Sequence, residues 1–255
     1  MVPHTKAFLS YRKLSQAHIN FVVLVCHAVP AFRADLALPQ ITCSYPPDHF
    51  KAERNPKSEV ASYVSKYQDD LARSTLVTVF SYFEAYIKDA LTEIVEFHGG
   101  KKNFKQKSLE RTARFIAQLP PALKAHKRKL QDNHSASKKE KYQKHGRILD
   151  KEGFKFPTDL FAHYGVSRLL EKLDEKKGMR AWEIPFIVEE CLLFPISKSQ
   201  VEDFEAMRGM RNKITHGRSH PISLKESLRK ASLLHSLAAE IDGHIAEHFL
   251  VIQPA

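Results

Sequence analysis

The sequence predicts an all-α protein, and three features of its 255 residues support this fold class. Only nine glycines occur, and long segments contain neither glycine nor proline, which favours helices over many short strands. Apolar residues recur at spacings of three and four, as in helices with one buried face. A hydrophobic content of 43% allows a substantial core in one large or two small domains. We therefore expect a bundle of six or seven helices.

The N-terminal part, residues 1–57, is predicted to hold a helix over residues 4–29 followed by a wrapping loop. Five prolines in residues 30–57 favour the loop, with an extended piece around residues 38–45. Basic residues before the apolar run 21–25 imitate a signal peptide, but Asn20 and His27 interrupt the run. No stretch approaches the roughly 20 apolar residues of a membrane span, so we expect no membrane contact.

The second part, residues 58–255, is predicted to begin with a helix over residues 58–98 that bends or breaks once and ends at Gly99-Gly100. At 100° per residue its aromatic and aliphatic side chains share one face, and Glu84 lies on that face. An isolated buried carboxylate is costly, so Glu84 must take up a proton or find a cation.

A strongly basic insertion follows at about residues 101–151. It contains 16 Lys/Arg against four Asp/Glu, whereas the remaining residues contain 24 against 25, so the whole net charge of +11 comes from this segment. Such a run is either a solvated face or a patch that attracts nucleic-acid phosphates. The candidate RNA-binding residues are Lys124, Lys127, Arg128, Lys129, Lys138, Lys139 and Arg218.

Four further helices are expected after the insertion, over residues 158–177, 182–194, 199–217 and 223–249. Short loops are expected between these helices. Within the basic insertion, a short helix is expected over residues 108–119. Ser199 with Glu202, and Ser223 with Glu226, have the spacing of capping boxes. His235 falls among apolar residues of the last helix and is interpreted as a core or interface histidine.

Arg211 breaks the pattern of the helix over residues 199–217. It falls at about 280° when Val201 is set to zero, within the arc of Phe204, Met207 and other apolar residues. A charged residue on an apolar face marks either a buried ion pair or a functional site. His216 follows five residues later at the helix end, where it also complements the helix dipole. Glu84 is the candidate carboxylate partner of Arg211.

Metal sites and disulfides are not expected. There are three cysteines, at positions 26, 43 and 191, and they are widely spaced. The histidines of the insertion do not have the spacing of metal ligands. No glycine-rich phosphate loop or nucleophile motif is present. We therefore expect no metal or cofactor, and the cytoplasm as location.

Arg211-Asn212 followed by His216 resembles the signature of the HEPN family. That signature is an arginine, usually followed by a polar residue, then four to six residues and a histidine. The aromatic-rich run around Glu84 is similar to the first core helix of those domains. The resemblance covers roughly residues 60–98 and 155–252. It implies a HEPN-like helical bundle with a long N-terminal extension and a basic insertion.

The resemblance also implies an activity. HEPN ribonucleases need no metal, leave 2′,3′-cyclic phosphate and 5′-hydroxyl ends, and act as homodimers. On this basis Arg211 would stabilise the phosphorane, His216 would transfer protons, Asn212 would orient the phosphate or His216, and Glu84 would hold Arg211. We expect a toxin or antiphage effector with RNA as substrate and an inhibitory partner or antitoxin. The alternatives are a non-catalytic RNA- or protein-binding module and an accessory scaffold.

Overall fold

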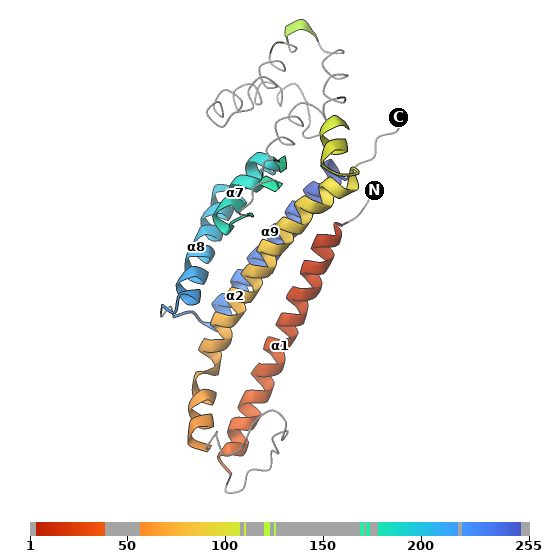
Figure 1. The fold of residues 1–255 in the computed structure, drawn as a ribbon. Helices are drawn as coiled ribbons and strands as arrows, with labels where there is room; N and C mark the ends of the chain where they lie inside the picture. The colour runs from red at the N-terminus through yellow and green to blue at the C-terminus, as the bar shows by residue number, and fades with distance from the viewer. Residues whose placement is uncertain are drawn as a thin grey trace. The chain divides into compact units, whose positions relative to one another are not determined.

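The structure is a computed structural model that describes residues 4–38, 57–107, 178–218 and 221–250, with a few isolated residues between 110 and 173. The described elements are helices, in agreement with the predicted all-α class (Figure 1). The chain divides into two compact units. Unit 1 contains residues 1–10, 84–205 and 236–255, and unit 2 contains residues 11–83 and 206–235. The predicted division near residue 57 stays a prediction.

The first two helices are long. Helix α1 spans Lys6–Leu36 and α2 spans Lys57–Phe97. The predicted end of the first helix at residue 29 is wrong, because α1 continues through Pro30. A proline removes one backbone hydrogen bond, but it does not stop a helix whose flanking residues keep helical geometry. The bounds of α2 agree with the prediction to within one residue, although α2 is continuous rather than broken.

Between Ala181 and Cys191 the chain forms three short turns instead of the predicted single helix over residues 182–194. These are the 3₁₀ turn η3 (Ala181–Glu183), α7 (Ile184–Phe186) and the π-turn η4 (Ile187–Cys191). The wider π-turn is closed by the bond from Leu192 N–H to the carbonyl of Ile187, 3.0 Å long. The predicted helices over residues 108–119 and 158–177 lie largely outside the described residues.

Two helices complete the described chain, α8 (Lys198–Thr215) and α9 (Leu224–His248). The cap of α8 lies two residues before the predicted one. Ser197 Oγ accepts the N–H of Gln200, and the side chain of Gln200 accepts the N–H of Ser197, so Ser199 and Glu202 do not form the box. The cap of α9 is confirmed, since Ser223 Oγ accepts the N–H of Glu226 at 3.1 Å.

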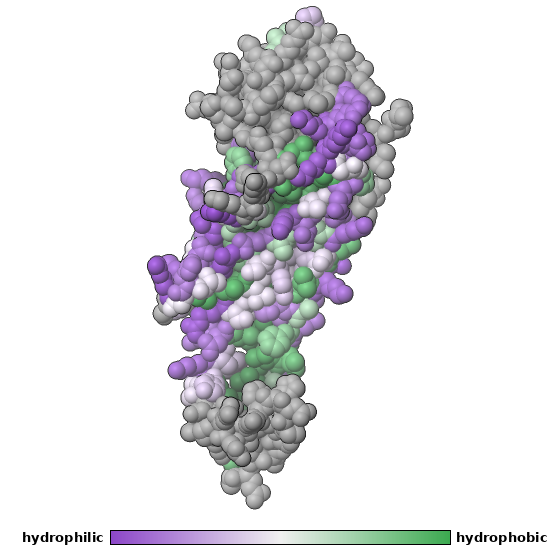
Figure 2. All heavy atoms as spheres, in the orientation of Figure 1, coloured by the Kyte–Doolittle hydropathy of each residue, from purple (hydrophilic) through white to green (hydrophobic). Residues whose placement is uncertain are grey.

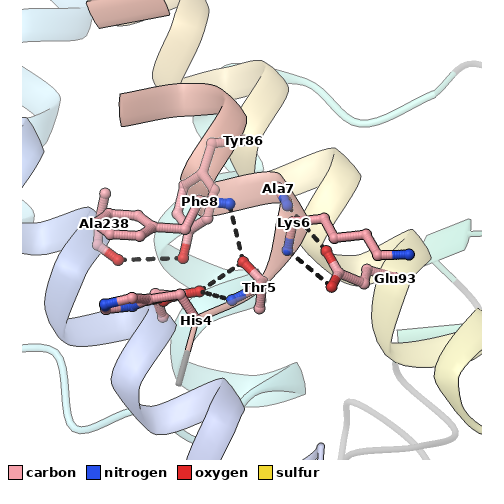
Figure 3. A network of polar contacts seen from close by, with 9 residues as sticks. His4, Thr5, Lys6, Ala7, Phe8, Tyr86, Glu93 and Ala238 are labelled. Atoms are coloured by element: carbon pink, nitrogen blue, oxygen red, sulfur yellow. Dashed lines mark hydrogen bonds and ion pairs between the residues drawn. The ribbon is translucent and has the colours of Figure 1, made fainter. Parts of the chain in front are cut away.

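In unit 1, carboxylates from two other helices hold the start of α1 (Figure 3). The buried Asp242 of α9 accepts the Thr5 N–H at 3.1 Å and the Thr5 hydroxyl at 2.5 Å. Glu93 of α2 accepts the N–H groups of Lys6 and Ala7, each at 2.9 Å. These N–H groups have no partner within the helix, and negative charge is favourable at a helix N-terminus. The two carboxylates thereby fix where α1 begins.

In unit 2, the apolar face of α2 forms the centre of the core. Leu76, Phe80 and Phe83 are fully buried. The ring of Tyr11 on α1 packs edge-on against Phe83 with centroids 6.4 Å apart, and burial raises the pKa of Tyr11 to about 12. Ser227 of α9 donates its hydroxyl to the backbone carbonyl of Ala72 at 2.8 Å. Parts of α1 and α9 are therefore fastened to α2 in this unit.

Two expectations from the sequence are not met, one for His235 on α9 and one for the apolar run of α1. His235 is exposed and stacks on Tyr11 with ring centroids 6.0 Å apart, so it is not a core residue. By length and composition alone, helix α1 could cross a membrane, and only 11% of its most apolar stretch is buried. The expectation that no segment approaches a span is therefore wrong for α1, although core helices and leader segments have the same composition.

Candidate active site

The last turn of α8 ends in a left-handed glycine cap. Gly217 has φ +69°, and its N–H donates to the carbonyl of Ile214 at 3.0 Å. The N–H of Arg218 donates to the carbonyl of Lys213 at 2.9 Å. These two bonds together define a Schellman motif, in which Gly217 occupies the left-handed position. His216, one residue earlier, is therefore the last residue before the chain reverses its twist.

Arg211 lies one turn before this cap with its guanidinium over an aromatic ring. Its Cζ is 5.0 Å from the centroid of Phe80, which is fully buried on α2. Its Nη1 donates to the side-chain oxygen of Asn212 at 3.0 Å. A guanidinium over a ring face gains about 0.5–2 kcal/mol, depending on how far it is desolvated. The ring and the amide together restrict the plane and the rotation of the half-buried Arg211 side chain.

The backbone around Arg211 is also held. Thr215 Oγ1 donates to the carbonyl of Arg211 at 3.0 Å and lies 3.1 Å from the carbonyl of Asn212. The carbonyl of Asn212 also accepts the backbone N–H of His216, so the Thr215 hydroxyl is an additional donor to this turn. It ties the Thr215 side chain back to the segment that carries Arg211 and Asn212.

His216 is exposed at the end of α8, and its backbone N–H donates to the carbonyl of Asn212 at 3.1 Å. Asn212 therefore contacts two of the other predicted catalytic residues, Arg211 through its side chain and His216 through its backbone. Within the described residues, no side-chain hydrogen bond of His216 is present. An exposed imidazole at this point is accessible to a substrate in solvent.

The other predicted site residues are Glu84, Arg218 and the basic residues of the insertion. Glu84 is half-buried on α2, and its pairing with Arg211 stays a prediction. Arg218 is exposed directly after the glycine cap. The predicted RNA-binding lysines and Arg128 of the insertion lie outside the described residues. No group of three or more potential metal ligands occurs within the described part of the chain.

Phe80 is the residue that the sequence interpretation did not include in the site. The helical pattern of α2 identifies it as a buried core residue, and nothing local distinguishes it from Phe83. The placement of Arg211 within an apolar arc is the sequence signal that points to a residue such as Phe80. A guanidinium on a core face needs either a carboxylate or an aromatic ring beside it.

Comparison with known proteins gives one match. The family model described as RiboL-PSP-HEPN matches residues 48–247, well over half of the chain. No curated protein and no solved structure matches the chain significantly. The matched residues include α2, α8 and most of α9, and therefore Glu84, Phe80, Arg211, Asn212 and His216, whereas α1 precedes them.

Proposed function

Since the chain belongs to the RiboL-PSP-HEPN family, we propose that it is a metal-independent endoribonuclease whose site is the Gly-capped end of α8. The observation that supports this most directly is Arg211, held over Phe80 and by Asn212 one turn before the exposed His216. HEPN membership by itself points to an RNA-related role, and the chemistry of these side chains supports the finer assignment.

The reaction needs no group beyond those of the RNA and the protein. The 2′-hydroxyl oxygen attacks the adjacent phosphorus, the bond to the 5′-oxygen breaks, and the products are a 2′,3′-cyclic phosphate and a 5′-hydroxyl. One proton leaves the 2′-hydroxyl and one is added to the 5′-oxygen. Imidazole suits both transfers because its ordinary pKa lies near neutrality. A guanidinium keeps its charge and donates bidentately to phosphate oxygens as negative charge builds up.

Each site residue has a separate role in this proposal. His216 transfers protons, and Arg211 stabilises the crowded phosphorane. Asn212 orients Arg211, which its side chain contacts in the structure. Glu84 tunes the local field. A second copy of the chain supplies the other histidine, so that acid and base come from different protomers. The biological setting we propose is a cytoplasmic toxin or antiphage effector restrained by an inhibitory partner.

The test uses the purified full chain, an RNA oligonucleotide and the same oligonucleotide with a single 2′-deoxy substitution at the cut site. We expect cleavage with cyclic-phosphate and 5′-hydroxyl ends that a chelator does not reduce. His216→Ala should lower the rate about 10²–10⁴-fold, since that is the contribution of general acid–base catalysis. The 2′-deoxy substrate should not be cut at that position.

The matched control is His235→Ala, which removes another exposed histidine, on α9. It should cleave as the unchanged chain does. Cleavage that survives in His216→Ala, or that proceeds on the 2′-deoxy substrate, would contradict the proposal. Salt-dependent RNA binding without any cyclic-phosphate product would instead support the binding-module alternative, which the +12 net charge of residues 101–151 favours.

A further inference from the structure

A groove lies in unit 2 between the first half of α1 and the first half of α9. It has a volume of about 300 Å³, at the lower end of the range for small-molecule sites. Tyr11 of α1 stacks on His235 of α9 at one end, and Ile19 and Leu228 line the groove two turns farther along the two helices. Val79 of α2, which is 2% exposed, lies beneath. None of the candidate active-site residues lines this groove, so it is a separate feature of the molecule.

The groove exists because the middle of both helices carries small side chains. Ser15 of α1 and Ala231 and Ser232 of α9 line it there, whereas large side chains stand at its two ends. The stacked rings of Tyr11 and His235, with centroids 6.0 Å apart, keep the two helices separated. Protein interiors are normally close-packed, and a void forfeits contacts for the side chains around it. A molecule that fills the groove would therefore gain those contacts.

One polar group in the groove is left without a hydrogen bond. Ser15 Oγ is buried and makes no hydrogen bond of good geometry within the described residues. Burial raises the pKa of Tyr11 to about 12, and the neighbouring Ser15 hydroxyl works against that rise. Since a buried hydroxyl without a partner is costly, a ligand with a polar substituent would stabilise this position.

The charge of the groove is positive. Arg12 is exposed at its rim and carries the only permanent charge among the described residues that line it. No aspartate or glutamate is among these lining residues. A guanidinium binds a carboxylate through two parallel hydrogen bonds, and one guanidinium balances one negative charge. The groove therefore favours a ligand with a single carboxylate.

This mixed lining distinguishes the groove from the exposed part of α1 that follows it. After Ile19 the large exposed side chains of α1 are apolar, among them Phe21, Val23 and Leu24. Figure 2 shows hydrophobic residues along the lower part of the course that α1 takes in Figure 1. A lipid chain or an apolar helix would favour that stretch, whereas a cation and an unbonded hydroxyl beside an apolar floor favour a small polar molecule.

We propose that the groove binds a small aromatic carboxylate. The flat ring lies over Val79 between Ser15 and Ala231, where the side chains of both helices are small. The carboxylate meets Arg12, and a hydroxyl on the ring meets Ser15 Oγ. Arg12 and Ser15 are three residues apart on α1, so they lie on one side of the helix. Tyr11 is placed to contact the edge of the ligand ring.

The first experiment measures binding to the purified full chain by titration calorimetry without RNA, so its outcome is independent of the proposed nuclease activity. The probe is 6-hydroxy-2-naphthoate, whose two fused rings suit a groove of about 300 Å³. We expect one molecule per chain with a Kd between about 10 μM and 1 mM, as is usual for a ligand of this size. The uncharged 6-hydroxy-2-naphthamide should bind about three- to tenfold more weakly, because it forms no ion pair with Arg12.

Two variants with matched controls locate the site. Arg12→Gln should weaken naphthoate binding by that same factor and leave naphthamide binding unchanged. Lys13→Gln removes an equal charge from the next residue, which does not line the groove, and should change neither. Ala231→Leu should abolish the binding of both compounds by filling the groove, whereas Ala17→Leu, at an exposed position outside the groove, should not.

A stability measurement accompanies the filling variant. Urea unfolding of Ala231→Leu should give a midpoint equal to or above that of the natural chain, because the leucine occupies empty space. Ser232→Leu, at an exposed position in the same part of the groove, provides the binding test if Ala231→Leu does not fold.

Several results would overturn the proposal. These are the absence of naphthoate binding, which would mean that water alone fills the groove, and equal affinities for the naphthoate and the naphthamide. Binding that survives in a folded Ala231→Leu or Ser232→Leu chain, or that Arg12→Gln and Lys13→Gln weaken equally, would place the ligand elsewhere. Tighter binding of octanoate than of the naphthoate would show that the groove takes an aliphatic chain instead of a ring.

Discussion

At the scale of single residues, the site depends on how a permanently charged side chain is held on an apolar face. A guanidinium is planar and weakly hydrated, so it can lie on a ring where an ammonium would be too strongly solvated. Phe80 provides that ring, and Asn212 fixes one edge of the guanidinium. The helix face that appears inconsistent with a charge is therefore suited to an arginine and not to a lysine.

The first residue-scale prediction concerns Phe80→Leu. Losing the ring should lower kcat about five- to thirtyfold, which corresponds to about 1–2 kcal/mol of cation–π contact. Phe83→Leu is the matched control, because Phe83 is equally buried on the same helix but packs on Tyr11. Both variants should lose stability by about 1–2 kcal/mol. Steady-state cleavage kinetics at a temperature where both are folded will check this; equal kcat values would rule out a positioning role for Phe80.

At the scale of elements, the ends of α8 and α1 follow different rules. The end of α8 is set locally, since only a residue tolerant of left-handed geometry closes its Schellman motif. The start of α1 is set from a distance, by Asp242 and Glu93 on two other helices. Its continuation through Pro30 likewise needs packing support, because local propensity disfavours it.

Gly217 in the cap of α8 and Gly209 within α8 provide an element-scale prediction, in which one substitution by alanine destabilises the protein and the other stabilises it. Gly217→Ala should destabilise the protein by about 1 kcal/mol, because φ +69° is unfavourable for a residue with a Cβ. Gly209→Ala on the same helix should stabilise by about 0.5–1 kcal/mol, since its Cβ would meet nothing within 4 Å and alanine favours helix. Urea unfolding of both variants will measure the difference. Equal effects of the two substitutions would show that the cap is not needed.

At the scale of the whole molecule, each unit contains a histidine that resists protonation. Burial lowers the pKa of His244 in unit 1, where its Nε2–H donates to the carbonyl of Leu192 at 2.8 Å. Burial also lowers the pKa of His18 in unit 2. The ordinary pKa of a histidine is 6.5, so as the pH falls these two side chains take up protons in the unfolded chain before they do so in the folded one.

We therefore predict that these two histidines reduce the stability of the protein as the pH falls below about 6.5. Their contribution is constant above that range, declines as pH falls, and levels off below the lowered pKa of the folded state. Denaturant midpoints measured between pH 8 and pH 5 should show this fall, and His244→Gln, which keeps a donor for Leu192, should make it shallower. An unchanged pH dependence in His244→Gln would exclude His244 as a source.

The sequence by itself determined what depends on neighbouring residues. It located α2 and α9 to within a residue or two, the cap at Gly217, and the HEPN-like Arg211-Asn212 and His216. Helical periodicity, caps and glycine geometry act within about one or two turns, so a single sequence records them.

Only the tertiary structure decided which distant groups meet. It brought Phe80 under Arg211, Asp242 onto Thr5 across 237 positions, and α1 onto α2 in unit 2 so that a second face of α1 stayed exposed. It also extended α1 beyond Pro30 and divided residues 181–191 into three turns. The physical reason is that burial and long-range hydrogen bonds outweigh local propensities of a few tenths to one kcal/mol per residue, and no local pattern encodes their partners.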